Sequence, residues 1–176
     1  MLFRSGLGSS SAFCVGLLNA LYRYKGESVS RSQLAEEAAH IEINILGRPI
    51  GKQDHYAAAI GGLNLIRFNE DDSTLIMPAV VDKKVEHALF SSLLTFWTGI
   101  SRASETILSE QNHNNAVNAE VLAAMRNQAE DTYDLCVNRD FSIEEFGAIL
   151  NEGWLMKKKL ATNISNEFID ETYDTA

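Results

Sequence analysis

The sequence has little proline, little cysteine and no surplus of positive charge. Only two prolines occur in 176 residues, whereas hydrophobic residues make up 45%, a composition that predicts a packed core and little disorder. The two cysteines, Cys14 and Cys136, lie far apart among apolar neighbours, which favours buried free thiols over a disulfide or a metal pair. The net charge of −9 argues against a nucleic-acid-binding surface, because such a surface needs basic residues to neutralise phosphates.

Long apolar runs and zinc motifs are also missing. The most apolar stretch, residues 88–97, is short and contains serines and a threonine, so we expect no membrane span. Residues 1–18 are interrupted by glycine and serine and lack a cleavage site, which argues against a signal peptide and favours a cytoplasmic location. The four histidines do not have the close spacing of metal ligands.

What the sequence does have is a Gly/Ser-rich segment that runs directly into a helical pattern. Its residues are Gly6, Leu7, Gly8, Ser9, Ser10, Ser11 and Ala12. Glycine lets the main chain approach an anion closely, and the first turn of a helix offers N–H groups without an internal partner. No Gly-Lys-Ser/Thr closes the segment, which excludes a Walker-type loop, and there is no room for the strand of a dinucleotide fingerprint. A phosphate site remains, with a plain N-cap cluster of serines as the alternative.

Hydrophobic periodicity predicts an α+β fold with a helical second half. The expected helices span residues 11–25, 30–45, 114–138 and 142–159, and the expected hairpin pairs 63–68 with 74–77. A strand is expected over 89–97, with a helix over 85–94 as the alternative. Capping boxes are expected at Ser30 with Gln33 and at Ser142 with Glu145.

Two motifs together resemble the GHMP family of small-molecule kinases. The segment from Gly6 to Ala12 resembles the family's phosphate-binding loop, and Gly51-Lys52-Gln53-Asp54 resembles the segment that carries a catalytic aspartate. The longer run over 46–64, together with 151–154 and 163–166, is similar to the branch that phosphorylates D-glycero-D-manno-heptose 7-phosphate at its anomeric carbon. The resemblance implies a partial GHMP N-terminal domain over 1–80, two-layered with an incomplete sheet, and a partial, mainly helical C-terminal domain over 81–176.

The resemblance also implies roles for particular residues in ATP- and Mg²⁺-dependent transfer to a sugar phosphate. Asp54 is the expected base for the sugar hydroxyl, or the group that orients it. Glu42 and Ser10 are the expected Mg²⁺ ligands, with Ser9 and Ser11 as alternatives to Ser10. The separation from Glu42 to Asp54 is similar to that between the metal-binding Glu and the catalytic Asp of the galactokinase branch. The backbone of Gly6, Gly8, Ser9, Ser10, Ser11 and Ala12 is expected to hold the nucleotide, and Gly51, Lys52 and Tyr56 to contact the substrate.

Other interpretations of these residues stay open. Glu42 could be a solvated helix carboxylate, Asp54 a turn former, and Arg48 and Lys52 either surface charges or ligands of a substrate phosphate. The family's first and third motifs are not found, so the chain resembles the middle of a kinase. It could therefore be a non-catalytic fragment that self-associates through exposed sheet edges. A galactose- or fucose-type sugar kinase is a further alternative.

Overall fold

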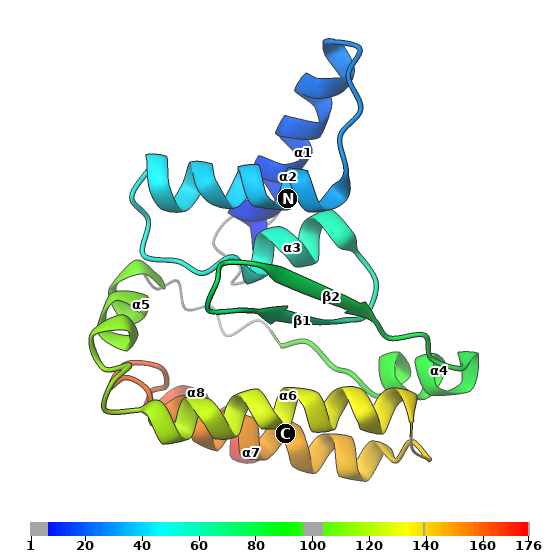
Figure 1. Ribbon diagram of the computed structural model, residues 1–176. Helices are drawn as coiled ribbons and strands as arrows, with labels where there is room; N and C mark the ends of the chain where they lie inside the picture. The colour runs from blue at the N-terminus through cyan, green and yellow to red at the C-terminus, as the bar shows by residue number, and fades with distance from the viewer. Residues whose placement is uncertain (1–6, 97–103, 139, 176) are drawn as a thin grey trace. The chain divides into compact units, whose positions relative to one another are not determined.

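The computed structural model describes residues 7–96, 104–138 and 140–175. The chain divides into two compact units (Figure 1). One comprises Met1–Pro78 with Ser101–Leu108, and the other comprises Ala79–Ile100 with Ser109–Ala176. The division into domains at residue 80, predicted from the sequence, stays a prediction.

The first unit begins with three helical elements that pack on one another. Helix α1 spans Ser9–Tyr24, α2 spans Arg31–His40, and α3 spans Gln53–Ile60. Helix α2 packs against both α1 and α3, and α1 also contacts α3. Helix α2 continues directly into η1, a π-helical turn over Ile41–Ile45. A π-turn within a helical run is uncommon and is frequently found at functional sites.

The core of this unit forms where α1 crosses α2 and α3. Val15, Leu34 and Ala38 are buried there, and Val29 and Ala59 are among the residues packed around them. The small alanines of α2 let the helices approach closely, since two more of them, Ala35 and Ala39, are almost fully buried. The core therefore fixes α1, α2 and α3 relative to one another.

A β-hairpin completes the described part of the first unit. Strand β1, Asn64–Phe68, pairs antiparallel with β2, Thr74–Pro78, so that Ile66 lies opposite Ile76. Asp72 in the connecting turn has a positive φ of 64°. Helix α3 packs on β1 through an edge-to-face contact between Tyr56 and Phe68.

The second unit is helical in its described residues. Helix α4 spans Lys83–Ser91, α6 spans Ala119–Val137, α7 spans Ile143–Lys158, and α8 spans Glu167–Thr175. Helix α5, Ser104–His113, crosses the division between the units. Helices α6 and α7 pack on each other, and Leu135 is fully buried. None of the helices in the described part is long and apolar enough to cross a membrane.

The structure confirms the predicted α+β class, the hairpin and both N-caps. The Ser30 and Ser142 side chains accept hydrogen bonds from the backbone N–H groups of Gln33 and Glu145. The strand predicted over 89–97 is wrong for its described residues, because residues 83–91 are helical and the next five are irregular. Asp82 caps this helix through the N–H of Lys84, a start signal that outweighs the local β propensity. Trp97, the end of that predicted strand, lies outside the described residues.

The prediction of buried free thiols is confirmed for Cys136 and holds only in part for Cys14. Both thiols are free, with Cys136 buried and Cys14 half-buried. Burial raises the pKa of Cys136. For Cys14, burial is again the main cause of a raised pKa, and the nearby Glu42 carboxylate adds to it. Neither thiol therefore has the lowered pKa that is typical of a nucleophilic cysteine.

Candidate functional site

The N-terminal end of α1 is a turn whose backbone an anion can approach closely. Gly8 is the N-cap and adopts a left-handed conformation with φ of 65°, which an L-residue with a side chain enters only at a cost. The Ala12 N–H donates to the Gly8 carbonyl at 2.9 Å and so belongs to the helix ladder. In an α-helix the first-turn N–H groups point outward along the axis, and α1 has no acidic residue in its first turn. This end of α1 is therefore suited to an anion.

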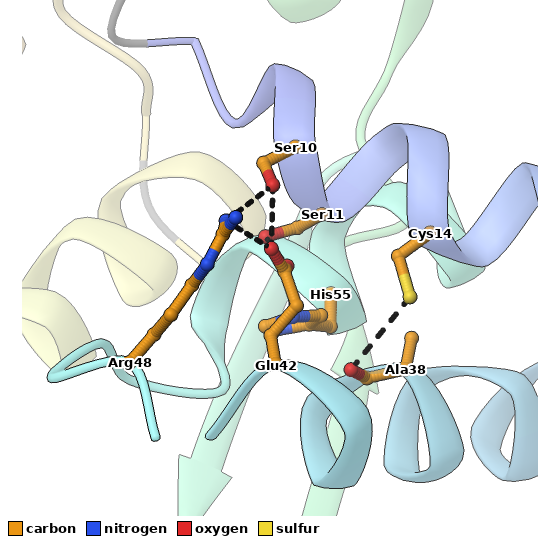
Figure 2. A network of polar contacts seen from close by, with 7 residues as sticks. All are labelled: Ser10, Ser11, Cys14, Ala38, Glu42, Arg48 and His55. Atoms are coloured by element: carbon orange, nitrogen blue, oxygen red, sulfur yellow. Dashed lines mark hydrogen bonds and ion pairs between the residues drawn. The ribbon is translucent and has the colours of Figure 1, made fainter. Parts of the chain in front are cut away.

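A buried carboxylate lies beside this turn. Glu42, from η1, is 3% exposed and accepts hydrogen bonds from two serines of α1 (Figure 2). Ser10 Oγ donates to Oε1 at 2.5 Å, and Ser11 Oγ donates to Oε2 at 3.0 Å. The burial contradicts the alternative that Glu42 is a solvated helix carboxylate. The network joins the Gly/Ser segment to the turn that ends the second helix.

His55, in the first turn of α3, contacts the same carboxylate through its ring nitrogen. It is fully buried, and its Nε2 lies 2.8 Å from Glu42 Oε2. Burial by itself raises the pKa of Glu42, but the hydrogen bonds from Ser10, His55 and Ser11 outweigh it and hold the pKa below its ordinary value. An ionised carboxylate only accepts hydrogen bonds, so His55 Nε2 carries the proton in this contact.

Arg48 completes the network from the loop that follows η1. Its Nη1 donates to Glu42 Oε1 at 2.7 Å and to Ser10 Oγ at 2.8 Å (Figure 2). The arginine side chain is 39% exposed, whereas that of Glu42 is 4% exposed, so a cation reaches a buried carboxylate from the solvent side. Arg48 is therefore more than a surface charge.

The donor set at this point fits Mg²⁺. A hydroxyl and an ionised carboxylate are the hard oxygen ligands that Mg²⁺ prefers, and it commonly takes only one or two from protein, with the rest from phosphates and water. The guanidinium bridges Ser10 Oγ and Glu42 Oε1, which indicates that this oxygen pair attracts a cation. Groups of three or more His, Cys, Asp and Glu side chains able to hold a metal do not occur among the described residues.

Asp54 lies directly against the α1 turn. A Cβ added to Gly8 would stand 3.2 Å from both Cγ and Oδ2 of the Asp54 carboxylate. Asp54 is in the first turn of α3, one position before His55, so the alternative of a turn former is wrong. The structure therefore brings Gly8, Ser10, Ser11, Glu42 and Asp54 together, while Gly6 lies outside the described residues.

Two of the candidate substrate residues, Lys52 and Tyr56, lie around a different carboxylate, that of Glu36. Tyr56 is 2% exposed, and its hydroxyl donates to Glu36 Oε2 at 2.5 Å. Lys52 Nζ lies 3.8 Å from Glu36 and 3.3 Å from Asp72. Burial lowers the pKa of Lys52, but the two carboxylates outweigh this and raise it, so the ammonium stays charged. Gly51 has open space where a side chain would be.

A cavity of about 370 Å³ adjoins Lys52. It is lined by Glu36, Ala39, His40, Ile43, Asn44, Lys52 and Asp72. The lining comes from the α2–η1 run, from the hairpin turn and from the residue that precedes α3. Roles for Lys52 and Tyr56 in substrate binding stay predictions.

Sequence reasoning missed the position of His55 as a buried partner of Glu42 and the bridging position of Arg48. Both residues lie within the motif around Asp54, and their place in that motif is the only feature of the sequence that points to them. Contacts between residues that are distant in the chain depend on how α1, η1 and α3 pack.

Comparison with known proteins shows what these residues are similar to. Residues 3–62 match the model of the GHMP kinases N terminal domain. The chain is 26% identical to D-glycero-alpha-D-manno-heptose 7-phosphate kinase of Campylobacter jejuni, over 98% of this chain and 51% of that protein. It resembles the crystal structure of a D-glycero-D-manno-heptose 1-phosphate kinase from Bacteriodes thetaiotaomicron with a TM-score of 0.74 and 29% identity, covering 93% of this chain and 47% of that one. The chain thus spans about half the length of these two relatives.

Proposed function

We propose that the protein works as an ATP-dependent sugar kinase whose acceptor is a heptose phosphate, because residues 3–62 match the model of the GHMP kinases N terminal domain. The observation that carries the proposal is the meeting of Asp54 with Gly8 at the α1 turn, beside the Ser10–Glu42 oxygen pair. Phosphoryl transfer depends on positioning and charge neutralisation more than on covalent chemistry, and this cluster offers both.

Each group has a definite task in the proposed reaction. The first-turn N–H groups of α1 hold the β- and γ-phosphates of ATP at the positive end of the helix dipole. Asp54 accepts the proton of the sugar hydroxyl as its oxygen bonds to the γ-phosphorus and the bond from that phosphorus to the ADP oxygen breaks. Ser10 and Glu42 would hold Mg²⁺, which neutralises phosphate charge when bound. His55 and Ser11 keep the Glu42 carboxylate oriented and ionised.

The names of the relatives support a heptose phosphate as the acceptor of the phosphoryl group. Both names contain a heptose phosphate, and they differ in the position of the phosphate. We propose D-glycero-D-manno-heptose 7-phosphate, phosphorylated at its anomeric hydroxyl. Lys52, which is charged and borders the cavity, is a candidate ligand for the phosphate that the acceptor already carries.

The test is ADP release by the purified chain with Mg·ATP and heptose 7-phosphate, with galactose and fucose as alternative acceptors. We expect Asp54→Asn to lower kcat by about 10²–10⁴-fold, the usual contribution of a general base. Asp174→Asn, at an exposed aspartate of α8, is the matched control. Phosphorus NMR of the product tells whether the new phosphate is anomeric.

Two results would contradict the proposal in different ways. Full activity in Asp54→Asn would remove the aspartate from the chemistry. Absence of ATP binding by calorimetry in the unchanged protein would favour the alternative of a non-catalytic kinase fragment.

A further inference from the structure

Arg48 contacts the two oxygens that are proposed to hold the metal ion. Its Nη1 contacts Ser10 Oγ and Glu42 Oε1 at 2.8 and 2.7 Å, and these are the two oxygens assigned to Mg²⁺ above. Figure 2 shows the guanidinium reaching this pair from the opposite side to His55. The same oxygens therefore have two cations as candidate partners.

The buried charge of the Glu42 carboxylate favours a cation beside it. Glu42 is 3% exposed and ionised, and an unpaired charge at that depth is costly. Ser10, Ser11 and His55 supply hydrogen bonds, and Arg48 supplies a permanent positive charge. Lys52, which is close in sequence, pairs with Glu36 and Asp72 instead.

The two cations cannot occupy the pair together. Mg²⁺ holds its oxygen ligands at about 2.0–2.1 Å, well inside the contacts that Arg48 makes. An ion on that side of the oxygen pair would overlap the guanidinium, and the two positive charges would repel each other. Ser10 Oγ would also have to offer the metal the lone pair that now accepts the Arg48 N–H.

We infer that Arg48 is a resident cation of the Ser10–Glu42 pair that must leave when the divalent metal enters. This inference rests on the proposed function, because it takes the oxygen pair as the metal site. The arginine side chain is 39% exposed, so it has room to move toward solvent while the buried carboxylate stays in place. The guanidinium competes with the metal, and its departure leaves a planar fork free to bind a phosphate.

The first test measures affinity for Mn²⁺, a paramagnetic probe that binds the same kind of oxygen site, by electron paramagnetic resonance without nucleotide. If the arginine is displaced about a tenth of the time in the unchanged protein, Arg48→Gln binds Mn²⁺ about tenfold more tightly. Arg48→Lys, which keeps the charge, is expected to remain near the affinity of the unchanged protein. Arg23→Gln is the matched control, since Arg23 is an arginine of α1 that contacts Ser28.

A second measurement follows Arg48 in the unchanged protein, and a variant serves only to assign its signal. The Nε–H signal of Arg48 in the unchanged protein, assigned by its absence from Arg48→Lys, is followed by NMR as Mg·ATP is added. We expect this signal to shift or broaden while that of Arg23 stays in place.

The outcomes separate the inference from the proposal it rests on. If Mn²⁺ binds Arg48→Gln no more tightly than the unchanged protein, while Glu42→Gln abolishes binding, the metal site stands and the exchange is wrong. An Arg48 signal that is indifferent to Mg·ATP also overturns the exchange. If Mn²⁺ binds none of these proteins, or binds Glu42→Gln normally, the metal site itself is wrong and the exchange fails with it.

Discussion

Replacing Gly8 by alanine tests whether the α1 turn positions the base. The new Cβ would lie 3.2 Å from Asp54 Cγ and Oδ2, so the carboxylate must move by a few tenths of an ångström. The left-handed backbone, with φ of 65°, adds a cost of about 1–2 kcal/mol to folding. Misplacing a catalytic group by about 1 Å can cost on the order of a hundredfold in rate, so a smaller shift predicts roughly a tenfold loss of kcat.

The matched control is Gly26→Ala. Gly26 also has a positive φ, of 76°, but a Cβ there meets nothing within 4 Å. Urea unfolding should therefore show a similar loss of stability in both variants, whereas ADP release should fall only in Gly8→Ala. In an Asp54→Asn background, Gly8→Ala should lower kcat little further, because the two changes act on the same group. Equal kcat values for Gly8→Ala and Gly26→Ala would refute the reasoning.

Three further changes examine other contacts. Glu42 has a depressed pKa in the folded state, so its stabilisation is fully present above its ordinary pKa of 4.5 and is lost as pH falls through the folded value. Glu42→Gln should thus cost about 1–3 kcal/mol near neutral pH, and urea titrations should show the deficit narrowing toward acid; a constant deficit would contradict this. Tyr56→Phe removes the bond to Glu36 and should cost about 1 kcal/mol. A raised KM for the acceptor in that variant would support the predicted substrate contact, and an unchanged one would limit Tyr56 to packing. Ser142→Ala removes the cap of α7 and should lower stability by about 1 kcal/mol, and unchanged thermal unfolding would contradict that role.

Local signals in the sequence predicted much of the fold. The periodicity around Leu34 and Ala38, the cap at Ser30 and the turn before Thr74 depend on neighbours along the chain, and the structure bears them out. Helix α4 was only the alternative to a strand, because its apolar residues suit both structures and the Asp82 cap was overlooked.

The site was only partly predictable for a different reason. Glu42, Ser10 and Asp54 were found through resemblance to a family motif, and the structure brings them close. The contacts of Arg48 and His55 with Glu42 arise from packing between α1, η1 and α3, and no short-range pattern encodes such contacts. The π-turn that carries Glu42 was not predicted either, because the apolar residues around it fit an ordinary continuation of the second helix.

The first turn of α3 ties the evolution of two positions together. Asp54 and His55 are consecutive, so the helix separates them by about 100° of rotation, and one faces Gly8 while the other reaches Glu42. An insertion or deletion of one residue within α3, between His55 and the core residue Ala59, would turn both side chains away from their partners at once. Length changes within α3 should therefore be rare among active relatives.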